Sequence, residues 1–387
     1  MLYHLLIQTD DWLDKIGLHS LLQVFYYLEF RAFVAVICSF LFVLLFGKKT
    51  IRWLIKQKIG DTPEFYHPDL NKMMALKAAT PTMGGILICA SIFVSIFLFA
   101  DLTNRYVIIA LIVLAWLAVL GGFDDWLKLT SARRAPGSRE GLYAWEKLLF
   151  QLGIGAVAGY FVFRYGVDKE ASRVLTLPFQ RTYQPGTMEL EEGVIVLGGF
   201  VFVTIATLII AATSNAVNIT DGMDGLAAGT LTVASFALMV LCFIAGSVDT
   251  AQYLLFPFVE HSKELMIVTG AMAGGCLGFL WFNCSPAQVF MGDTGALPLG
   301  GLMAYIAMAI RQEILLIVIG GVFFFEMASV ILQVAYFRYT GGKRIFRCSP
   351  IHHHFHLSGW SEQQVVTRFW VLAVVFAMIA LVSIKLR

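Results

Sequence analysis

Long apolar runs alternate with short polar segments along almost the whole chain. Crossing the hydrocarbon core of a bilayer as a helix takes about 20 residues. Ten runs approach or reach this length, at 24–47, 82–100, 105–123, 145–165, 194–213, 226–246, 265–282, 296–311, 314–337 and 365–385. Only Arg311, Gln312 and Glu313 separate the eighth run from the ninth. The pattern predicts an all-α, polytopic integral membrane protein with about ten transmembrane helices in a single domain, 1–387.

The composition agrees with this class. Hydrophobic residues make up 58% of the chain and charged residues 14%, whereas soluble domains carry about 25% charged residues. A net charge of +2 is too small to indicate nucleic acid as a partner. The six cysteines show no CxxC spacing, so we expect small apolar core residues. Asp10, Asp11 and Asp14 precede the first apolar run, so we expect no secretory signal, which would need a basic segment there.

With ten spans, the polar segments alternate between two sides of the membrane. One side holds 48–81, 124–144, 214–225, 283–295 and 338–364, and it carries more Lys and Arg than the other. The positive-inside rule makes this side cytoplasmic and places both termini outside the cytoplasm. The segment 166–193 is then an extracytoplasmic loop, in which strand-forming residues among Pro and Gly favour a short hairpin.

Asp124 and Asp125 stand next to each other at the end of the third apolar run. Two adjacent acids at a helix C-terminus meet the negative end of the helix dipole and also repel each other. Lys128 relieves part of this charge, so a solvated helix end is one interpretation. The pair more strongly favours a balancing cation, either Mg²⁺ or a cationic group of a substrate.

A second polar segment, Asn-Ala-Val-Asn-Ile-Thr-Asp-Gly-Met-Asp-Gly, follows the fifth run at 215–225. Thr220 or Asp221 could cap the next helix, and Asp224 would be favoured in its first turn. Capping does not explain why Asn215 and Asn218 accompany these acids. This density of polar groups suits a polar ligand such as a nucleotide or a sugar.

A third segment, 281–295, contains Asn283, Phe290 and Asp293. Gly292 and Gly295 flank Asp293 closely and leave backbone N–H groups open to anions, while the carboxylate is available for a metal. A helix-capping turn would account for Gly292 and Thr294. It would not account for Phe290, because a phenyl ring in an aqueous loop needs something to stack on it.

The fourth segment contains His352, His353 and His354 after Pro350. Three consecutive residues cannot all point at one ion from a regular helix or strand, and no Cys or acid stands at ligand spacing. Zinc is therefore disfavoured. Histidines that donate hydrogen bonds to phosphate or sugar oxygens fit better.

Two further polar residues stand out against the apolar pattern. Lys77 precedes the second run and would serve as an interface anchor or as a phosphate ligand. Glu326 lies well inside the ninth run, with Gln333 two turns later. An acid at that depth is costly unless it is paired, so we expect a partner on another helix or a place lining a lipid groove.

The parity of the spans brings all four segments and Lys77 to the same face of the membrane. Acids, amides, a lysine and histidines gathered there indicate a Mg²⁺–phosphate centre at the boundary between lipid and water. A transporter or flippase would instead bury such groups near the bilayer midplane. Only Glu326 and Gln333 are clearly polar residues near the middle of a predicted span.

These motifs resemble those of the polyprenyl-phosphate N-acetylhexosamine-1-phosphate transferases, over nearly the whole chain from about residue 30. The acid pair and the runs 215–225 and 283–295 are similar to the marks of that superfamily. The segment Pro-Ile-His-His-His-Phe at 350–355, with Gly359 and Trp360, resembles the branch whose donor carries a muramoyl pentapeptide. The triple histidine argues against a rival donor of the UDP-GlcNAc type.

The resemblance implies an activity and a setting. Undecaprenyl phosphate and UDP-MurNAc-pentapeptide would give lipid I and UMP, with Mg²⁺, in peptidoglycan synthesis. The enzyme would be a homodimer in the cytoplasmic (inner) membrane, with its active site on the cytoplasmic face and membrane lipid as its surroundings.

The resemblance also implies residue roles. Asp293 would hold the metal, Asp124 would be the candidate base with Asp125 near it, and Lys77 would meet phosphate. The remaining positions would contact the donor: Asn218, Asp221 and Asp224 on the nucleoside side, Phe290 on uracil, Asn283 near the diphosphate, and His352, His353 and His354 toward the sugar phosphate. Asn215 is a further candidate for binding substrate. Lys147 is similar to a further lysine of the family, although the loop before it is longer than usual.

Overall fold

The computed structural model describes residues 2–15, 17, 19–57, 80–130, 141–166 and 169–386. Each of the ten predicted apolar runs contains a helix. The principal helices are α4 (Leu28–Lys56), α6 (Gly85–Phe99), α7 (Arg105–Thr130), α8 (Ala144–Tyr165), α9 (Gly199–Thr220), α10 (Leu226–Ala245), α12 (Leu265–Asn283), α13 (Asp293–Ala309), α15 (Gly321–Tyr339) and α17 (Glu362–Lys385). The predicted class, an all-α multi-pass membrane protein, is confirmed.

Shorter elements precede the principal helices or connect them. They are α1 (Leu2–Gln8), α2 (Asp10–Lys15), α3 (His19–Leu22), η1 (Gln23–Tyr26), η3 (Glu170–Arg173), α11 (Val248–Tyr253), η4 (Ser262–Glu264), α14 (Glu313–Ile319) and α16 (Ile351–Leu357). Two short strands, β1 (Val174–Leu175) and β2 (Ile195–Val196), pair in antiparallel fashion; β1 lies within the predicted extracytoplasmic segment 166–193, and β2 follows its end.

In the described part of the chain, eight helices are long and apolar enough to cross a membrane. Two of the ten predicted spans are shorter, because α6 has 15 residues and α13 has 17. The count of ten crossings therefore stays a prediction.

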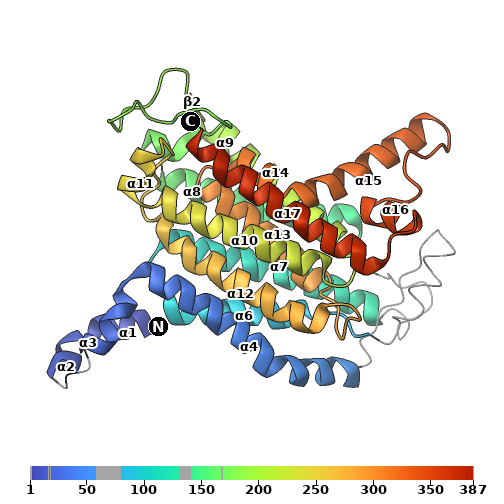
Figure 1. The fold of residues 1–387 in the computed structure, drawn as a ribbon, viewed down its shortest axis with the longest axis horizontal. Coiled ribbons are helices and arrows are strands. Elements are labelled where there is room, and N and C mark those ends of the chain that lie inside the picture. The colour runs from blue at the N-terminus through green and yellow to red at the C-terminus, as the bar shows by residue number, and fades with distance from the viewer. Residues whose placement is uncertain are drawn as a thin grey trace.

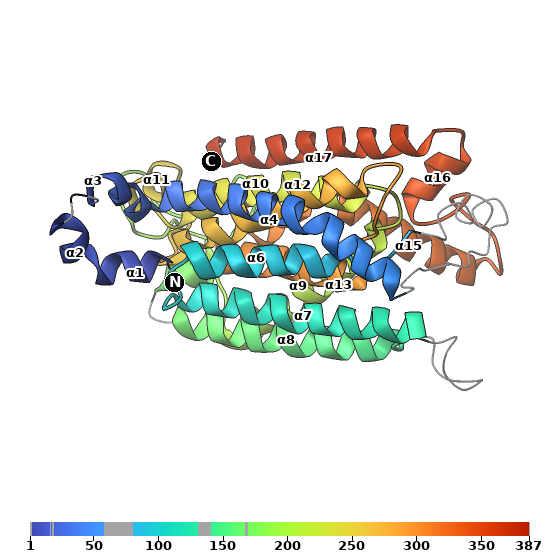
Figure 2. The same ribbon diagram turned by 90° about the horizontal axis from the view of Figure 1, so that it is seen from below.

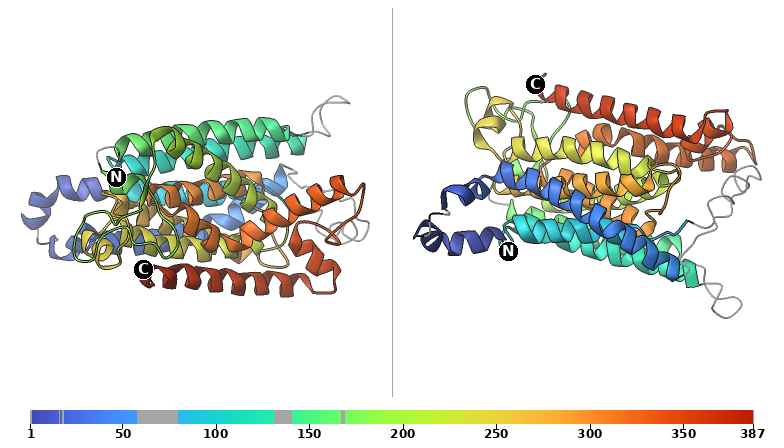
Figure 3. Two further views of the ribbon diagram at one scale, coloured as in Figure 1. Left: turned by 90° about the horizontal axis from the view of Figure 1, so that it is seen from above. Right: turned by 60° about the horizontal axis from the view of Figure 1, so that its bottom comes forward.

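The long helices run side by side (Figure 1). The short helix α16 lies at one end of the bundle, and α1–α3 and α11 lie at the other (Figure 2). Both chain ends lie in the half away from α16. The left view of Figure 3 shows that α15 leaves the bundle at an angle while α17 follows its outside, and α16 contacts both helices.

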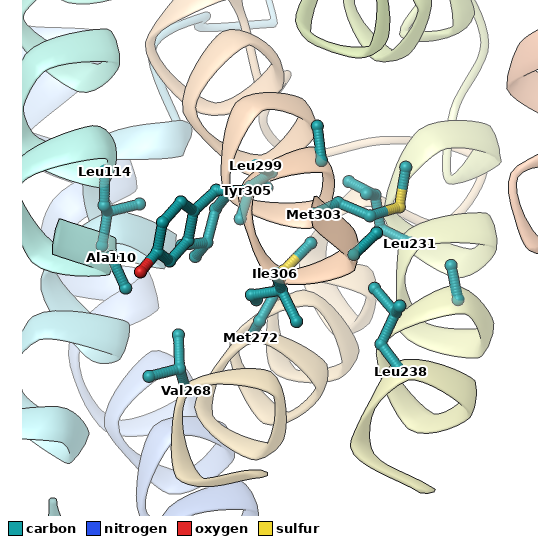
Figure 4. Close-up of a cluster of buried hydrophobic side chains, with 14 of the residues drawn as sticks. Ala110, Leu114, Leu231, Leu238, Val268, Met272, Leu299, Met303, Tyr305 and Ile306 are labelled. Carbon is teal, nitrogen blue, oxygen red and sulfur yellow. The ribbon is translucent and has the colours of Figure 1, made fainter. Parts of the chain in front are cut away.

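The helix α13 is the centre of the bundle, since all of its residues are buried. Figure 4 shows its side chains, among them Met303 and Tyr305, between those of α7, α10 and α12. The Tyr305 hydroxyl donates to the Tyr106 carbonyl at 2.8 Å, so even this polar group is satisfied inside the core. Burial on all sides fixes the position of the first residue of α13, Asp293.

Close packing of α12 against α4 depends on three glycines one turn apart. A Cβ atom at Gly270, Gly274 or Gly278 would lie only 2.7, 2.0 or 2.9 Å from a backbone oxygen of α4. Small residues at such spacing let two membrane helices approach until their backbones touch.

The predicted break near residue 312 is present, because α13 ends at Ala309 and α14 begins at Glu313. The charged residues of this break are buried rather than solvated. Arg311 and Glu313 are each 1% exposed and form an ion pair of 2.6 Å. Arg311 also donates to the Val174 carbonyl of β1 at 3.0 Å, so the strand segment covers the break.

Candidate active site

Three acidic side chains meet where α7 ends and α13 begins. Asp124, Asp125 and Asp293 are all buried, and one ligand atom of each lies within 4.8 Å of the others. This is the one group of three or more metal-ligating side chains found among the described residues. Carboxylate oxygens are the ligands that Mg²⁺ prefers, so the donor set fits this ion.

Two lysines partly neutralise these acids. Lys147 Nζ lies 2.8 Å from Asp124 Oδ2 and 3.0 Å from Asp293 Oδ2. Lys128 Nζ lies 2.8 and 3.2 Å from the same two oxygens. The two ammonium groups thus bridge α7 and α13 at the oxygens that a metal ion would use.

Asp125 has a different arrangement, because it caps the N-terminus of α13. Its oxygens accept hydrogen bonds from the Asp293 N–H at 3.2 Å and the Thr294 N–H at 2.9 Å. The Thr294 hydroxyl donates to it as well, at 2.6 Å. A carboxylate in this position satisfies orphan N–H groups and meets the positive end of the helix dipole. Asp125 therefore sets the position of Asp293.

Glycines allow α7 and α6 to approach this cap. A Cβ atom at Gly121 would lie 2.1 Å from the Asp293 carbonyl oxygen, and one at Gly85 would lie 2.1 Å from the Gly295 nitrogen. No side chain fits at either position.

The end of α9 brings in the first predicted amides. Asn218 donates to Asp293 Oδ1 at 2.7 Å, so one Asp293 oxygen faces the amide and the other faces the lysines. Asn215, one turn earlier, donates instead to Gln151 Oε1 at 2.6 Å and to the Ala211 carbonyl at 2.8 Å. It supports the helix end and does not contact the acids through these bonds.

The loop after α9 packs against the segment before α13. Asp221 accepts from the Gly292 N–H at 3.2 Å. Burial, together with the neighbouring Asp293 carboxylate, raises the pKa of Asp221 well above its ordinary value, against the lowering effect of this hydrogen bond. Asp224 accepts from the Ala287 N–H at 3.0 Å.

Asn283 and Phe290 lie in the segment between α12 and α13. The buried Asn283 amide joins the Gly225 N–H to the Val289 carbonyl, at 3.0 and 2.9 Å, and so ties the two loops together. Phe290 is half-buried, and its backbone pairs with Pro81 and Gly84 at 2.8 Å. Lys77 lies outside the described residues.

The histidines are placed by α16. His352 is fully buried, and its Nδ1 lies 3.0 Å from Glu326 Oε2 on α15, so Glu326 has the partner on another helix that the sequence predicts. Burial, then the neighbouring His352 and His356, lower the pKa of His353 to about 2, so this ring is neutral at pH 7. His354 Nδ1 accepts from the Arg347 N–H at 3.2 Å.

The sequence pattern indicated Lys128 as partial relief for the acid pair and Thr294 as part of a helix-capping turn, but it assigned neither residue to the site and gave no indication of Gln151. A signal existed for Lys128, since it follows Asp124 by four residues and must lie on the same helix face. Thr294 and Gln151 act through contacts between distant helices, and nothing in their local sequence indicates those contacts.

Comparison with known proteins adds independent information. A family model described as Glycosyl transferase family 4 matches residues 107–311. A phospho-N-acetylmuramoyl-pentapeptide-transferase of Oleidesulfovibrio alaskensis is 41% identical over 387 residues, covering 100% of both chains. Relatives of the same name come from Desulfotalea psychrophila, 41% identical over 94% of this chain and 96% of the relative, and from Flavobacterium johnsoniae, 36% identical over 100% of both chains.

Proposed function

Because this chain belongs to glycosyl transferase family 4, and within it to the phospho-N-acetylmuramoyl-pentapeptide-transferases, we propose a specific reaction for it. It transfers phospho-MurNAc-pentapeptide from UDP-MurNAc-pentapeptide to undecaprenyl phosphate, giving lipid I and UMP, with Mg²⁺ as cofactor. Membership of the family makes the protein a membrane transferase of peptidoglycan synthesis. The substrates, the metal and the residue roles below are the proposal.

One observation carries this proposal. Among the described residues, three buried carboxylates lie together at the end of a bundle of apolar helices, and two ammonium groups contact the carboxylates of Asp124 and Asp293. Charged groups inside a membrane protein are costly and mark sites of function. Both substrates are anions at the reacting phosphates, so a site for them needs cations held in fixed positions.

The reaction is written as a direct displacement. An oxygen of the lipid phosphate forms a bond with the β-phosphorus of the donor, and the bond from that phosphorus to the bridging oxygen breaks. UMP leaves with the electron pair. A phosphate monoester has a second pKa near 6, so the acceptor is already mostly dianionic at neutral pH. Asp124 therefore positions the acceptor more than it deprotonates it.

Asp124, Asp125 and Asp293, here called the acid group, would hold the metal, with Asp293 as its ligand. A bound Mg²⁺ would stabilise negative charge on the diphosphate and on departing UMP. Asn218 orients Asp293 through the 2.7 Å hydrogen bond. Lys128 and Lys147, together with Lys77, reduce the repulsion between the two phosphates. Asp125 keeps the N-terminus of α13 in place.

The donor contacts follow the loops around this centre. Asn218, Asp221 and Asp224 belong to the nucleoside side, Asn215 is a further residue that binds the donor, and Phe290 stacks on uracil. Asn283 braces the loop near the diphosphate. His352, His353 and His354 face the sugar phosphate. We place the site on the cytoplasmic face of the inner membrane, where a charged UDP-sugar and the phosphate of a lipid can meet, and we expect a homodimer.

The test is release of UMP by the detergent-solubilised protein from UDP-MurNAc-pentapeptide and undecaprenyl phosphate, with and without Mg²⁺. Wild type is expected to release UMP only with the metal. The variant Asp293→Asn is expected to lose about 10²–10³-fold in kcat, because removing one key electrostatic group typically costs that much. Ser235→Ala, which removes a buried hydroxyl whose hydrogen bond stays within α10, is the comparison and should keep close to wild-type activity.

Three results would each contradict a part of the proposal. Robust UMP release by Asp293→Asn would remove Asp293 from the metal role. Faster turnover of UDP-GlcNAc than of UDP-MurNAc-pentapeptide would change the donor. A covalent phospho-sugar adduct on Asp124 or Asp293, trapped with the donor alone, would replace direct displacement by a two-step route.

A further inference from the structure

The membrane helix α15 carries two buried polar residues that the apolar pattern does not explain, Glu326 and Gln333. The role of Gln333 is structural. Its Nε2 donates to the Phe346 carbonyl at 3.0 Å, and its Oε1 accepts from the Ile345 and Phe346 N–H groups, each at 3.0 Å. This amide fixes the chain that follows α15, and its hydrogen-bonding capacity is used there.

Glu326 is arranged differently. Its side chain is 0% exposed, and Oε2 lies 3.0 Å from His352 Nδ1. Within the described residues, Oε1 has no hydrogen-bond partner. A buried carboxylate with an unused oxygen costs several kcal/mol relative to an apolar side chain. Packing of α15 alone would therefore favour a residue such as leucine at this position.

His352 also has an unused atom. Its side chain is 0% exposed, and its Nε2 has no hydrogen-bond partner in the described part of the chain. This nitrogen faces the loop after α9, because a Cβ atom at Gly222 would lie 2.6 Å from it. Gly222 stands next to Asp221, whose carboxylate accepts from the Gly292 N–H beside Asp293. This buried, unpartnered nitrogen thus packs against the loop that reaches Asp124, Asp125 and Asp293.

The Glu326 carboxylate selects one tautomer of the ring when it is ionised. It can then only accept a hydrogen bond, so the proton of the pair lies on His352 Nδ1, which donates it. Nε2 is then the nitrogen left for a ligand. A carboxylate on the far side of an imidazole holds its orientation and tautomer, and it stabilises the ring when the second nitrogen becomes protonated.

We propose that Glu326 is a positioning residue, which holds His352 with Nε2 directed toward an oxygen of the donor's diphosphate bound beside the loop 221–225. The identity of this ligand rests on the proposed function. The pairing of Glu326 with His352, and its effect on the ring, does not.

The kinetic test compares Glu326→Leu, Glu326→Gln, His352→Asn and the double variant Glu326→Leu/His352→Asn. Loss of a group that orients another typically costs 10–100-fold. Glu326→Leu should lose about this much in kcat, and Glu326→Gln less, because its amide oxygen still accepts from Nδ1. The KM for undecaprenyl phosphate should not change. The double variant should be no slower than His352→Asn, since Glu326 acts through His352.

Ser329→Ala is the matched control. Ser329 is buried one turn along α15, and its hydroxyl donates to the Glu326 carbonyl at 2.7 Å. The Ser329→Ala variant removes a buried polar group from the same helix and should leave kcat unchanged. The proposal is overturned if Glu326→Leu keeps the wild-type kcat, or if the fold-losses in kcat of Glu326→Leu and His352→Asn multiply in the double variant. It is also overturned if Tm falls so far that unfolding of Glu326→Leu at the assay temperature explains its lost activity.

A second readout keeps this proposal separate from the proposed function. In protein labelled with ¹⁵N-histidine, the signals of His352 are those missing from His352→Asn. We expect a proton on Nδ1 in the wild type and its loss from Nδ1 in Glu326→Leu. An unchanged His352 tautomer in Glu326→Leu would refute the positioning role. If the wild type releases no UMP, the proposed function fails, and these spectra still decide the role of Glu326.

Discussion

The Lys128 ammonium group contacts the carboxylate oxygens that would bind a metal ion, so replacing this lysine should tighten Mg²⁺ binding. Its Nζ contacts Asp124 Oδ2 at 2.8 Å and Asp293 Oδ2 at 3.2 Å. A cation that binds these oxygens must first displace the ammonium group. The variant Lys128→Met keeps most of the length of the side chain and removes the charge, and with it the competitor.

The size of the effect follows from charge and exposure. At an effective dielectric constant of about 20, each contact at these distances corresponds to about 5–6 kcal/mol of Coulomb energy. The Lys128 side chain is 39% exposed, so water screens most of this energy. A net competition of about 1–2 kcal/mol remains, and 1.4 kcal/mol corresponds to tenfold in affinity. We expect the Mg²⁺ concentration for half-saturation to fall about tenfold.

The assay is a Mg²⁺ titration of Tm in detergent, followed by the Mg²⁺ dependence of UMP release. Tm reports binding even where the variant turns over slowly, as we expect if Lys128 also meets substrate phosphate. Lys128→Arg keeps the positive charge and is the control, with a half-saturation point close to that of wild type.

An unchanged Mg²⁺ requirement in Lys128→Met would show that the metal does not use the oxygens of Asp124 and Asp293 that Lys128 contacts. A weaker affinity would show that the lysine supports the metal rather than competing with it. Either result would refute the reasoning from the charge arrangement.

Two further predictions concern the supports of Asp293. Gly121→Ala should abolish folded protein in detergent, because its Cβ would lie 2.1 Å from the Asp293 carbonyl oxygen. Gly122→Ala is the control and should be tolerated, since the atom nearest to its Cβ would be 3.7 Å away. The yield of folded protein after size-exclusion chromatography distinguishes the two variants. Asp125→Asn should lower the free energy of unfolding by about 1–2 kcal/mol, the usual cost of a lost N-terminal cap. Thr294→Ala should lower it less, because the Asp125 carboxylate still caps α13. The shift in Tm measures both effects.

The sequence alone predicted the helical membrane class and the grouping of motifs, for a simple physical reason. Apolar runs of membrane length leave little freedom for the backbone, and alternate runs must end on the same face. Asp124, Asp125, Asn218 and Asp293 do come together at helix ends. Parity was enough to predict their meeting without any knowledge of how the helices pack.

The division of labour within the group was not predictable in this way. Asp124 and Asp125 are neighbours in sequence, yet one faces two lysines and the other caps α13. Successive residues of a helix point about 100° apart, so their surroundings depend on which helices lie on each side. Likewise, the ninth apolar run shows that Glu326 is out of place, and only the fold shows that its partner is His352.

The same charges explain how a polar centre persists at the end of an apolar bundle and then accepts anions. The carboxylates of Asp124 and Asp293 face two ammonium groups, and the neighbouring Asp125 carboxylate brings the formal charge of the whole group to one negative. A divalent cation bound to these oxygens would turn this into one positive charge and release the ammonium groups from the oxygens they share. Lys147 and Lys128 belong to α8 and α7, so they would remain beside the site and face the incoming phosphates. The lysines that stabilise the acids without a metal are therefore the groups best placed to bind substrate once a metal is present, and the competition measured with Lys128→Met is the first step of that exchange.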